Sequence, residues 1–525
     1  MKKHFFISFL LLPFFFNPNS SVPASDNPSG VISVSSLQQQ RSEEDKGPVD
    51  YVDPFIGVRD RSSFCTIGPQ VPFGSVNPGP ETPEGDHDGY APDQPVRGFA
   101  QLHVSGTGWG KYGQFLISPQ TGLKVKETGH DSHKANETAR PYYYGVDLTR
   151  YNIRTELAPT QHAVLYKFTF PESYSSHILI DITHSLVRDI ATYVGGKVSE
   201  GSVTVDTVSK NGISGYGKYA GGFGDGEYEV FFSARLSKPF SEYGTWKGNQ
   251  LSQKGEVAMS HENERIGAYL GYKTTKGETV YLKIGISLRS IDQAEKWLEN
   301  EIPAWDFNQV KNQAKQAWNK QLEKILVKGG SEKDKTIFYS ALYRSMMMPR
   351  DRTGDIKGWP EEAPLWDDHY AVWDTWRTMF PLMVLINPEM VRDNVNSFIA
   401  RFEKNHIVKD AFIAGNDMFR EQGGNNVDNV IADAYVKQVP GVNWEKAWEI
   451  LKYDADSQRL GIQNSPDPAN MDQVAASYKN RGWIPAGIMS CSISLEYSYN
   501  DFCAAEVARG LGKMSDYTRY LKRSH

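Results

Sequence analysis

The stretch TVYLKIGISLRSIDQAEKWLENEI, residues 279–302, contains the point at which the chain changes its secondary structure. Its first ten residues alternate between apolar and other side chains, which is typical of a strand in a half-buried sheet. After Ser290 the apolar residues recur three and four positions apart, as on one face of a helix. We therefore predict a strand-rich region before Ser290 and a helical region after it.

The sequence upstream of this point, from about residue 49 to residue 288, predicts an antiparallel β-sandwich. It is dense in glycine and proline, and no helical periodicity separates its short apolar runs. Strands at this spacing, joined by turns, are typical of packed antiparallel sheets. The runs that we assign to strands are HAVLYKFTF (162–170), HILIDIT (177–183), EYEVFFSARL (227–236), RIGAYLGYK (265–273) and TVYLKIGISL (279–288).

The sequence downstream predicts two linker helices in residues 289–329 and almost continuous helix in residues 330–525. Apolar residues recur at helical spacing, and glycine and proline mark the junctions. The economical architecture is therefore a β-sandwich followed by helices packed in pairs. The helical runs are IDQAEKWLENEI (291–302), FNQVKNQAKQAWNKQLEKILV (307–327), DKTIFYSALYRSMMM (334–348), DTWRTMFPLMVLI (374–386), MVRDNVNSFIARFEKN (390–405), NVDNVIADAYVKQV (426–439) and SISLEYSYNDFCAAEVARGLG (492–512).

The first residues, MKKHFFISFLLLPFFF (1–16), carry two lysines followed by a short apolar run. This pattern is typical of a secretory signal and is too short for a membrane span. Small residues follow at 22–25, so we assign residues 1–25 to a signal peptide and residues 26–48 to a flexible polar lead-in. We therefore expect export to the periplasm or the exterior of a bacterial cell.

The composition is that of a slightly acidic protein with two or more domains, because 525 residues exceed what one hydrophobic core holds. The net charge of −6 comes with no basic stripe, which argues against a nucleic-acid partner. Cys65, Cys491 and Cys503 are too few for a disulfide framework. We expect three buried thiols, although Cys491 and Cys503 could pair if the fold brings them together. Nothing in the sequence specifies an oligomeric state.

Histidines and carboxylates do not form a recognisable metal motif. HDSH (130–133) offers two imidazoles, and GDHDGY (85–90) places His87 between Asp86 and Asp88. A zinc or iron site needs three or four ligands, so we assign no metal ligand within the chain. We interpret both segments as polar surface loops, of which the second is compact enough to contribute hydrogen bonds to a site.

The run YAVWDTWRTMFPLMVLINPEM (370–390) places a carboxylate, Asp374, between two tryptophans. As local chemistry, Asp374 before an apolar run is a credible helix N-cap. Alternatively, its carboxylate accepts hydrogen bonds from two sugar hydroxyls, Arg377 donates to others, and a tryptophan face covers the ring. Pro381 predicts that the following helix is kinked or starts late. Both roles of Asp374 stay open at this point.

Many further blocks follow one another along nearly the whole chain. They are VDPFIGV (52–58), GPQVPFGSVNPGPET (68–82), GFAQLHVSGTGWGKYGQFLISP (98–119), FYSALYRSMMMPR (338–350), WDTWRTMFPLMVLINPEMV (373–391), VIADAYVKQV (430–439), SLEYSYNDFCAAEVARGLGK (494–513) and YLKRS (520–524). In this order they resemble glycoside hydrolase family 92, the calcium-dependent exo-acting α-mannosidases. The resemblance implies an α+β fold, with an N-terminal β-sandwich joined by helices to an (α/α)6 barrel. It also implies inverting removal of terminal α-mannose from mannose-containing glycans, with Ca²⁺ as cofactor.

The resemblance also implies a set of sugar-binding residues. Asp374 and Arg377 match the residues of the barrel that grip the sugar, and Trp373 lies beside them. Gly68 matches the position at which the sandwich presents its backbone to the same pocket. The loops that are expected to line the pocket hold Asp86, His87, Asp88, His103 and Trp109.

The acidic blocks of the family, which we expect to carry the general acid, the general base and the calcium ligands, follow the YLKRS block, where this sequence stops. We therefore expect the barrel in residues 330–525 to be incomplete and this chain to be inactive alone. Glu496 is the fallback candidate for the acid, against an interpretation as an ordinary barrel residue. The alternatives are a non-catalytic carbohydrate-binding protein that keeps the pocket, and another helical-barrel enzyme, such as a glucoamylase-like hydrolase or a disaccharide phosphorylase.

Overall fold

The computed structural model describes residues 46–58, 64–83, 88–106, 110–186, 197–223, 226–261, 263–418, 423–457, 476–485 and 490–525. The expected signal peptide and nearly all of the lead-in lie outside the described residues. Residues 47–525 belong to one compact unit, and all that follows concerns this unit.

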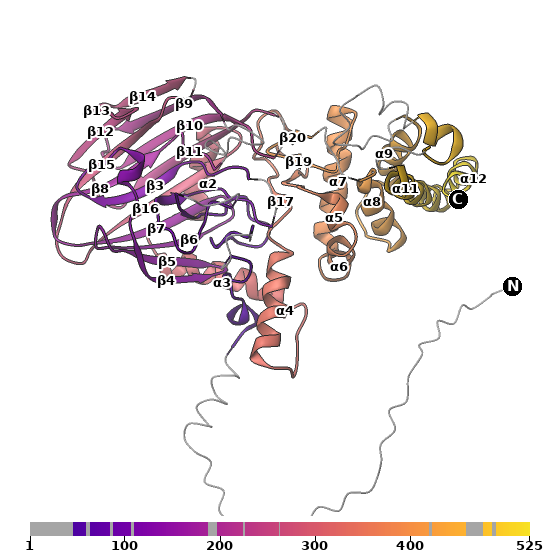
Figure 1. Cartoon of the computed structure of the whole chain (residues 1–525), viewed down its shortest axis with the longest axis horizontal. Coiled ribbons are helices and arrows are strands. Elements are labelled where there is room, and N and C mark those ends of the chain that lie inside the picture. The colour runs from indigo at the N-terminus through magenta and orange to yellow at the C-terminus, as the bar shows by residue number, and fades with distance from the viewer. Residues whose placement is uncertain are drawn as a thin grey trace, which may run out of the picture. The chain divides into compact units, whose positions relative to one another are not determined.

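Two antiparallel sheets make up the region that was predicted as a sandwich (Figure 1). The first sheet has the order β1 (Gly79–Glu81), β2 (Gly98–Ala100), β3 (Leu116–Thr121), β8 (Ser173–Asp181), β15 (Ile266–Thr274), β12 (Glu242–Lys247) and β13 (Gln250–Gln253). The second has the order β14 (Val257–His261), β9 (Lys197–Asp206), β10 (Gly212–Ala220), β11 (Tyr228–Leu236), β16 (Glu278–Ser287), β7 (Ala163–Phe170), β6 (Ile153–Pro159), β5 (Tyr143–Leu148) and β4 (Lys134–Arg140). Two short 3-10 helices, η1 (Pro48–Tyr51) and η2 (Glu127–Gly129), accompany them.

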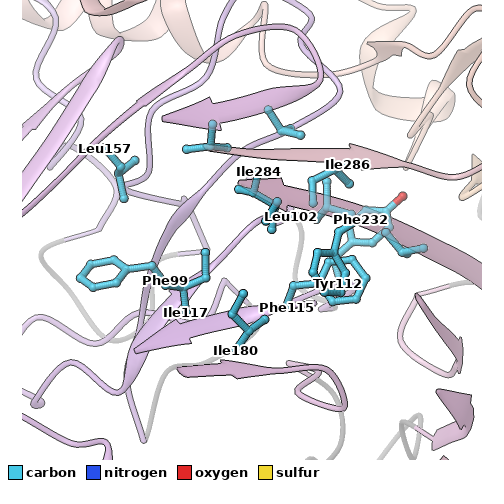
Figure 2. Packing of buried hydrophobic residues seen from close by; sticks show 14 of the residues in the cluster. Phe99, Leu102, Tyr112, Phe115, Ile117, Leu157, Ile180, Phe232, Ile284 and Ile286 are labelled. Carbon is cyan, nitrogen blue, oxygen red and sulfur yellow. The ribbon is translucent and has the colours of Figure 1, made fainter. Parts of the chain in front are cut away.

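Aromatic side chains from the two sheets meet in the core between them. The ring centroids of Phe99 in β2 and Tyr144 in β5 are 6.2 Å apart, and those of Phe115 and Phe232 are 4.6 Å apart. Figure 2 shows part of this buried cluster, in which the labelled side chains come from both sheets. The prediction of an antiparallel sandwich is therefore confirmed.

The two predicted linker helices are α2 (Ile291–Glu301) and α3 (Phe307–Leu322), and both begin at a capping side chain. The Ser290 hydroxyl accepts a hydrogen bond from the Gln293 amide at 3.1 Å, and the Asp306 carboxylate caps α3 in the same way. Such caps satisfy backbone donors that have no partner inside the helix.

Helix α2 lies directly on β16 and β11 of the second sheet. Gly285 in β16 permits this approach, because a Cβ at that position would lie 2.1 Å from the carbonyl oxygen of Ala294. Leu298 of α2 is fully buried in the contact. The first helix after the sandwich is therefore packed against it as part of the same core.

Helix α4 (Glu332–Arg344) is followed by a non-helical segment, residues 345–371. Within and after this segment two short ribbons form, β17 (Arg350–Asp351) with β18 (Trp366–Asp367), and β19 (Phe412–Ile413) with β20 (Asn416–Asp417). The prediction of almost continuous helix after residue 330 is thus wrong for residues 345–371. The reason is a run of helix-breaking residues, namely Pro349, Gly354, Gly358, Pro360 and Pro364.

The remaining helices pack in pairs, as predicted, with α6 on α7, α7 on α9, α8 on α11, and α11 on α12. Pro381 is the third residue of α6, where its missing N–H would have no partner in the helix, so the delayed helix start is confirmed. Among the described helices, none is both long and apolar enough to cross a membrane. These helices are α5 (Val372–Thr375), α6 (Met379–Ile386), α7 (Pro388–Asn405), α8 (Asn426–Val436), α9 (Trp444–Ser457), α11 (Ser490–Gly510) and α12 (Met514–Arg523).

The three cysteines are free thiols. Cys491 and Cys503 both lie in α11, about 18 Å apart along its axis, whereas a disulfide needs Cα atoms within about 7 Å. Cys503 is buried, Cys65 is half-buried and Cys491 is exposed. The expectation of three buried thiols is therefore wrong for Cys65 and Cys491.

Candidate functional site

Asp374 is the third residue of the short helix α5 and does not cap a helix. Ala371 is the N-cap of α5 and Thr378 that of α6, and neither cap is made by a side chain. The Asp374 carboxylate is exposed and has no hydrogen bond to any described residue. Partial burial raises its pKa, and the charge of Arg377 opposes this rise. The capping interpretation is therefore wrong, and the carboxylate is free to bind a ligand.

Asp374 lines a pocket of about 310 Å³ whose walls come from distant parts of the sequence. One wall is the loop between β2 and β3, and the other is the chain around α5. This volume is at the lower end of the range for small-ligand pockets. The lining residues are Ser105, Gly106, Arg344, Ser345, Met348, Pro349, Asp368, His369, Tyr370, Ala371, Asp374, Thr375 and Met379.

Arg377 lines a neighbouring hollow of about 320 Å³ and not the pocket of Asp374. Its guanidinium lies 4.6 Å over the Trp376 ring and donates a hydrogen bond to Glu496 Oε1 at 2.5 Å. Glu496, the fallback candidate for the acid, is thus the ion-pair partner of Arg377. This contact supports the interpretation of Glu496 as a barrel residue bonded to its neighbours.

Trp373 does not supply a ring to either hollow. Its side chain is 9% exposed and packs in the hydrophobic cluster that extends from the sandwich. Trp376, which the sequence placed beside Asp374, is stacked on Tyr499 with ring centroids 5.0 Å apart. The structure therefore brings Asp374 to the pocket but leaves Trp373 and Trp376 out of its lining.

His103 belongs to a buried polar cluster near the start of the same loop. Its Nδ1 donates to the carbonyl oxygen of Asn77 at 2.8 Å, and its Nε2 is 3.0 Å from the carboxylate of Glu81. In the second contact the two groups are not aligned for a hydrogen bond. Glu81 was missed in the sequence, where it lies in GPET (79–82) without any sign of a histidine partner.

Asp88 is buried beside this cluster, so its interpretation as part of a surface loop is wrong. Burial raises the pKa of Asp88 to about 7, with a smaller contribution from Glu81. Its Oδ2 has no hydrogen-bond partner among the described residues. Asp86, His87 and Trp109, the other predicted residues of these loops, lie outside the described residues.

Gly68 packs backbone against backbone and does not line the pocket. A Cβ at Gly68 would lie 2.0 Å from the carbonyl oxygen of Pro78, so only glycine fits. Its carbonyl oxygen accepts a hydrogen bond from the Asn77 side chain at 3.1 Å. The structure therefore gives Gly68 a role in holding together the loop that precedes β1.

Four charged side chains are fully buried between the sandwich and the chain around α5. Arg350 and Arg352 lie against Asp367 and Asp368, and each of the four is 0% exposed. Buried charges are rare unless they are paired. Sequence reasoning missed this group, although the adjacent aspartates at 367–368, which directly follow the apolar run at 363–366, are a signal that could have found it.

The described residues do not by themselves fit a calcium ion. In the ranges that the structure covers, no three His, Cys, Asp or Glu side chains gather closely enough to hold a metal ion. Calcium takes six to eight oxygen ligands, and Asp374 alone supplies too few of them. No chemical step is therefore assigned to a metal here.

Comparison with known proteins gives matches along both halves of the chain. The profile "Glycosyl hydrolase family 92 N-terminal domain" matches residues 51–287, and "Glycosyl hydrolase family 92 catalytic domain" matches residues 293–525. An uncharacterized secreted glycosidase of Arthroderma benhamiae is 30% identical over 90% of this chain. The chain spans 61% of the length of that relative.

Solved structures with the same fold include two from Bacteroides thetaiotaomicron. A family 92 α-mannosidase has a TM-score of 0.78 at 26% identity, covering 91% of this chain and 65% of its own. It has also been solved in complex with mannoimidazole, with 63% of that chain covered. An inverting family 92 mannosidase, from strain VPI-5482, has a TM-score of 0.79 at 25% identity, covering 91% of this chain and 64% of its own. The expected fold class, a β-sandwich followed by a helical barrel domain, agrees with these structures.

Proposed function

The chain belongs to glycoside hydrolase family 92, and we propose that it acts in the removal of terminal α-mannose residues from glycans with inversion. The likeness to a Bacteroides α-mannosidase and to an inverting mannosidase supports this substrate and outcome. We propose that it works after export, in the periplasm or outside the cell. The name of the Arthroderma relative, a secreted glycosidase, supports this location.

The observation that carries the proposal is the unbonded carboxylate of Asp374 in the pocket. A carboxylate has two acceptor oxygens, and adjacent hydroxyls of a sugar ring donate one hydrogen bond to each. These bonds are charge-assisted and therefore stronger than bonds between neutral groups. Asp374 is thus suited to orient the ring, while the loop at Ser105 and Gly106 closes the opposite side.

Inverting hydrolysis needs two carboxyl groups besides one that only binds the sugar. One is the general acid and the other is the general base, and they lie on opposite faces of the sugar, roughly 6.5–9.5 Å apart. Asp368, the other carboxylate among the described lining residues, is held by two arginines, and Glu496 is paired with Arg377. Both carboxylates are therefore already paired with arginines. We therefore assign Asp374 to binding and propose that these 525 residues alone bind mannosides without hydrolysing them.

A non-catalytic carbohydrate-binding protein is the second candidate function. The same observation favours it. Asp374 has no hydrogen bond to a described residue, whereas Asp368 and Glu496 are already paired with arginines. Calcium dependence stays part of the first proposal, and it is tested by adding the ion or a chelator.

The test measures binding and hydrolysis separately with the full chain. Isothermal titration with mannoimidazole and methyl α-mannoside reports binding, with methyl α-glucoside, which differs from methyl α-mannoside only in the configuration at C2, as a control. Release of aglycone from an aryl α-mannoside, with calcium or chelator, reports hydrolysis. We expect mannose-selective binding and no turnover. Calcium-dependent turnover would contradict the assignment of Asp368 and Glu496, and the absence of mannoside binding would overturn the proposed function.

A further inference from the structure

Asp368 lies at the junction between the pocket and the buried charged group. It is buried and lines the pocket, and its backbone has a φ of 57°. This left-handed conformation is uncommon for residues with a side chain, although aspartate adopts it more readily than most. Asp368 and Asp374 belong to one short continuous segment of chain, so a shift of Asp368 would also move Asp374.

The carboxylate of Asp368 has three buried partners. Its Oδ1 accepts a hydrogen bond from the Tyr112 hydroxyl at 2.5 Å. Its Oδ2 is 3.0 Å from Arg352 Nη2 and 3.3 Å from Arg350 Nη1, which are charge contacts without hydrogen-bond alignment. These charge contacts add to the backbone hydrogen bonds between His369 and Phe412 that also hold this segment.

Arg350 connects this segment to the opposite wall of the pocket. Its Nη2 donates a hydrogen bond to the carbonyl oxygen of His103 at 2.5 Å. Ser105 and Gly106, two and three residues after His103, line that wall. One guanidinium thus contacts the chain of both walls.

Two arginines face two aspartates in this group. Arg352 contacts both Asp367 and Asp368, whereas Arg350 contacts Asp368, so Asp368 is the carboxylate that balances Arg350. Burial lowers the pKa of Arg350, and the charge of Asp368 opposes this. A buried charge that loses its partner is strongly unfavourable. Without the charge of Asp368, Arg350 would have to move towards water, and its bond to His103 would be lost.

We propose that Asp368 is a positioning residue, which holds the two walls of the Asp374 pocket at a set distance through Arg350 and the His103 carbonyl. The consequence for sugar binding rests on the proposed function, whereas the coupling of the two walls does not. Asp368 itself is not assigned a contact with substrate.

The test compares Asp368→Asn with Asp417→Asn in the full chain. Asp417 is the partner of another buried arginine, Arg401, and lines neither hollow, so both variants remove one carboxylate from a buried ion pair. Hydrogen exchange is followed by mass spectrometry in peptides that cover residues 99–106 and 369–376. In Asp368→Asn we expect both peptides to exchange at least roughly tenfold faster, because both walls lose their tie. In Asp417→Asn neither peptide should change by more than about twofold.

Faster exchange in residues 369–376 alone would overturn the proposal, since the walls would then be independent. If Asp368→Asn does not fold, Tyr112→Phe removes the hydrogen bond to Asp368 and the one that the hydroxyl accepts from Arg352, and it keeps every charge. It should loosen the same two peptides to a smaller extent, and loosening of one peptide alone would again overturn the proposal.

Titration with mannoimidazole adds a second arm. If the wild type binds, Asp368→Asn should weaken the affinity by at least roughly tenfold and Asp417→Asn should not; equal affinities would contradict the positioning role. If the wild type does not bind, the proposed function fails, while the exchange data still decide whether the two walls are coupled.

Discussion

Asp374→Asn should weaken sugar binding while leaving the fold intact. The carboxylate is exposed and has no hydrogen bond to a described residue, so the free energy of unfolding should change by less than about 0.5 kcal/mol. A hydrogen bond to a charged group contributes about 1.5–3 kcal/mol. Because the amide keeps one neutral acceptor, we expect the loss of at least one such bond, or a rise in Kd of roughly 10- to 100-fold.

Isothermal titration with mannoimidazole measures the Kd, and thermal unfolding of the same samples measures the stability. Asp292→Asn is the matched control, since Asp292 is an exposed carboxylate in the first turn of α2 and lines neither hollow. The pKa of Asp374 is raised by partial burial, so the affinity of the wild type should fall as the pH drops through that pKa. The affinity of the variant should stay constant. A lower melting temperature with an unchanged Kd would refute this reasoning and restore a structural role for the carboxylate.

Three further predictions concern pH and thiol chemistry. Burial raises the pKa of Asp88 from 3.8 to about 7, so the native state keeps a proton that the unfolded chain releases, and stability should fall from about pH 4 to pH 7. In urea denaturation, Asp88→Asn should lack this slope and gain up to ~4 kcal/mol above pH 7; an unchanged slope would contradict the assignment. For His162 and Glu301, burial disfavours the charged form of each side chain. Their 2.7 Å hydrogen bond outweighs burial, so the pKa of His162 is raised and that of Glu301 is lowered. The pair should therefore stabilise most between about pH 4.5 and 6.5, and Glu301→Gln should cost most stability there and less at pH 9. In the native protein, DTNB should modify Cys491 rapidly and Cys503 only on unfolding, as mapped by mass spectrometry.

Local signals predicted the architecture well because they act within a few residues. Ser290 caps the first helix where the apolar period changes, and Pro381 sets the start of α6. The boundary between strands and helices depends on such neighbours alone. The prolines and glycines of residues 345–371 are equally compatible with short junctions between helices, so the sequence does not predict this non-helical segment.

The site was harder to predict, because its geometry depends on residues that are distant in sequence. Nothing near Glu81 indicates that His103 is its partner, and nothing near Arg350 indicates that it contacts both His103 and Asp368. Burial is also a property of the whole fold, so the residues around Asp88 in sequence do not reveal that it is buried. Asp374 was found because its neighbours in sequence and a family resemblance both singled it out.

Helices α2 and α3 cover the second sheet, and this determines where the chain can be divided into fragments for expression. The two family profiles separate between residues 287 and 293, at the junction of β16 and α2. Leu165 of β7, Leu298 of α2 and Phe307 of α3 nevertheless share one buried cluster. A fragment that stops at residue 288 would leave this face of the sheet in water and would tend to associate through it. A fragment that extends to Leu322 carries its own cover, so the sandwich should be produced, crystallised or fused to other proteins with both helices attached.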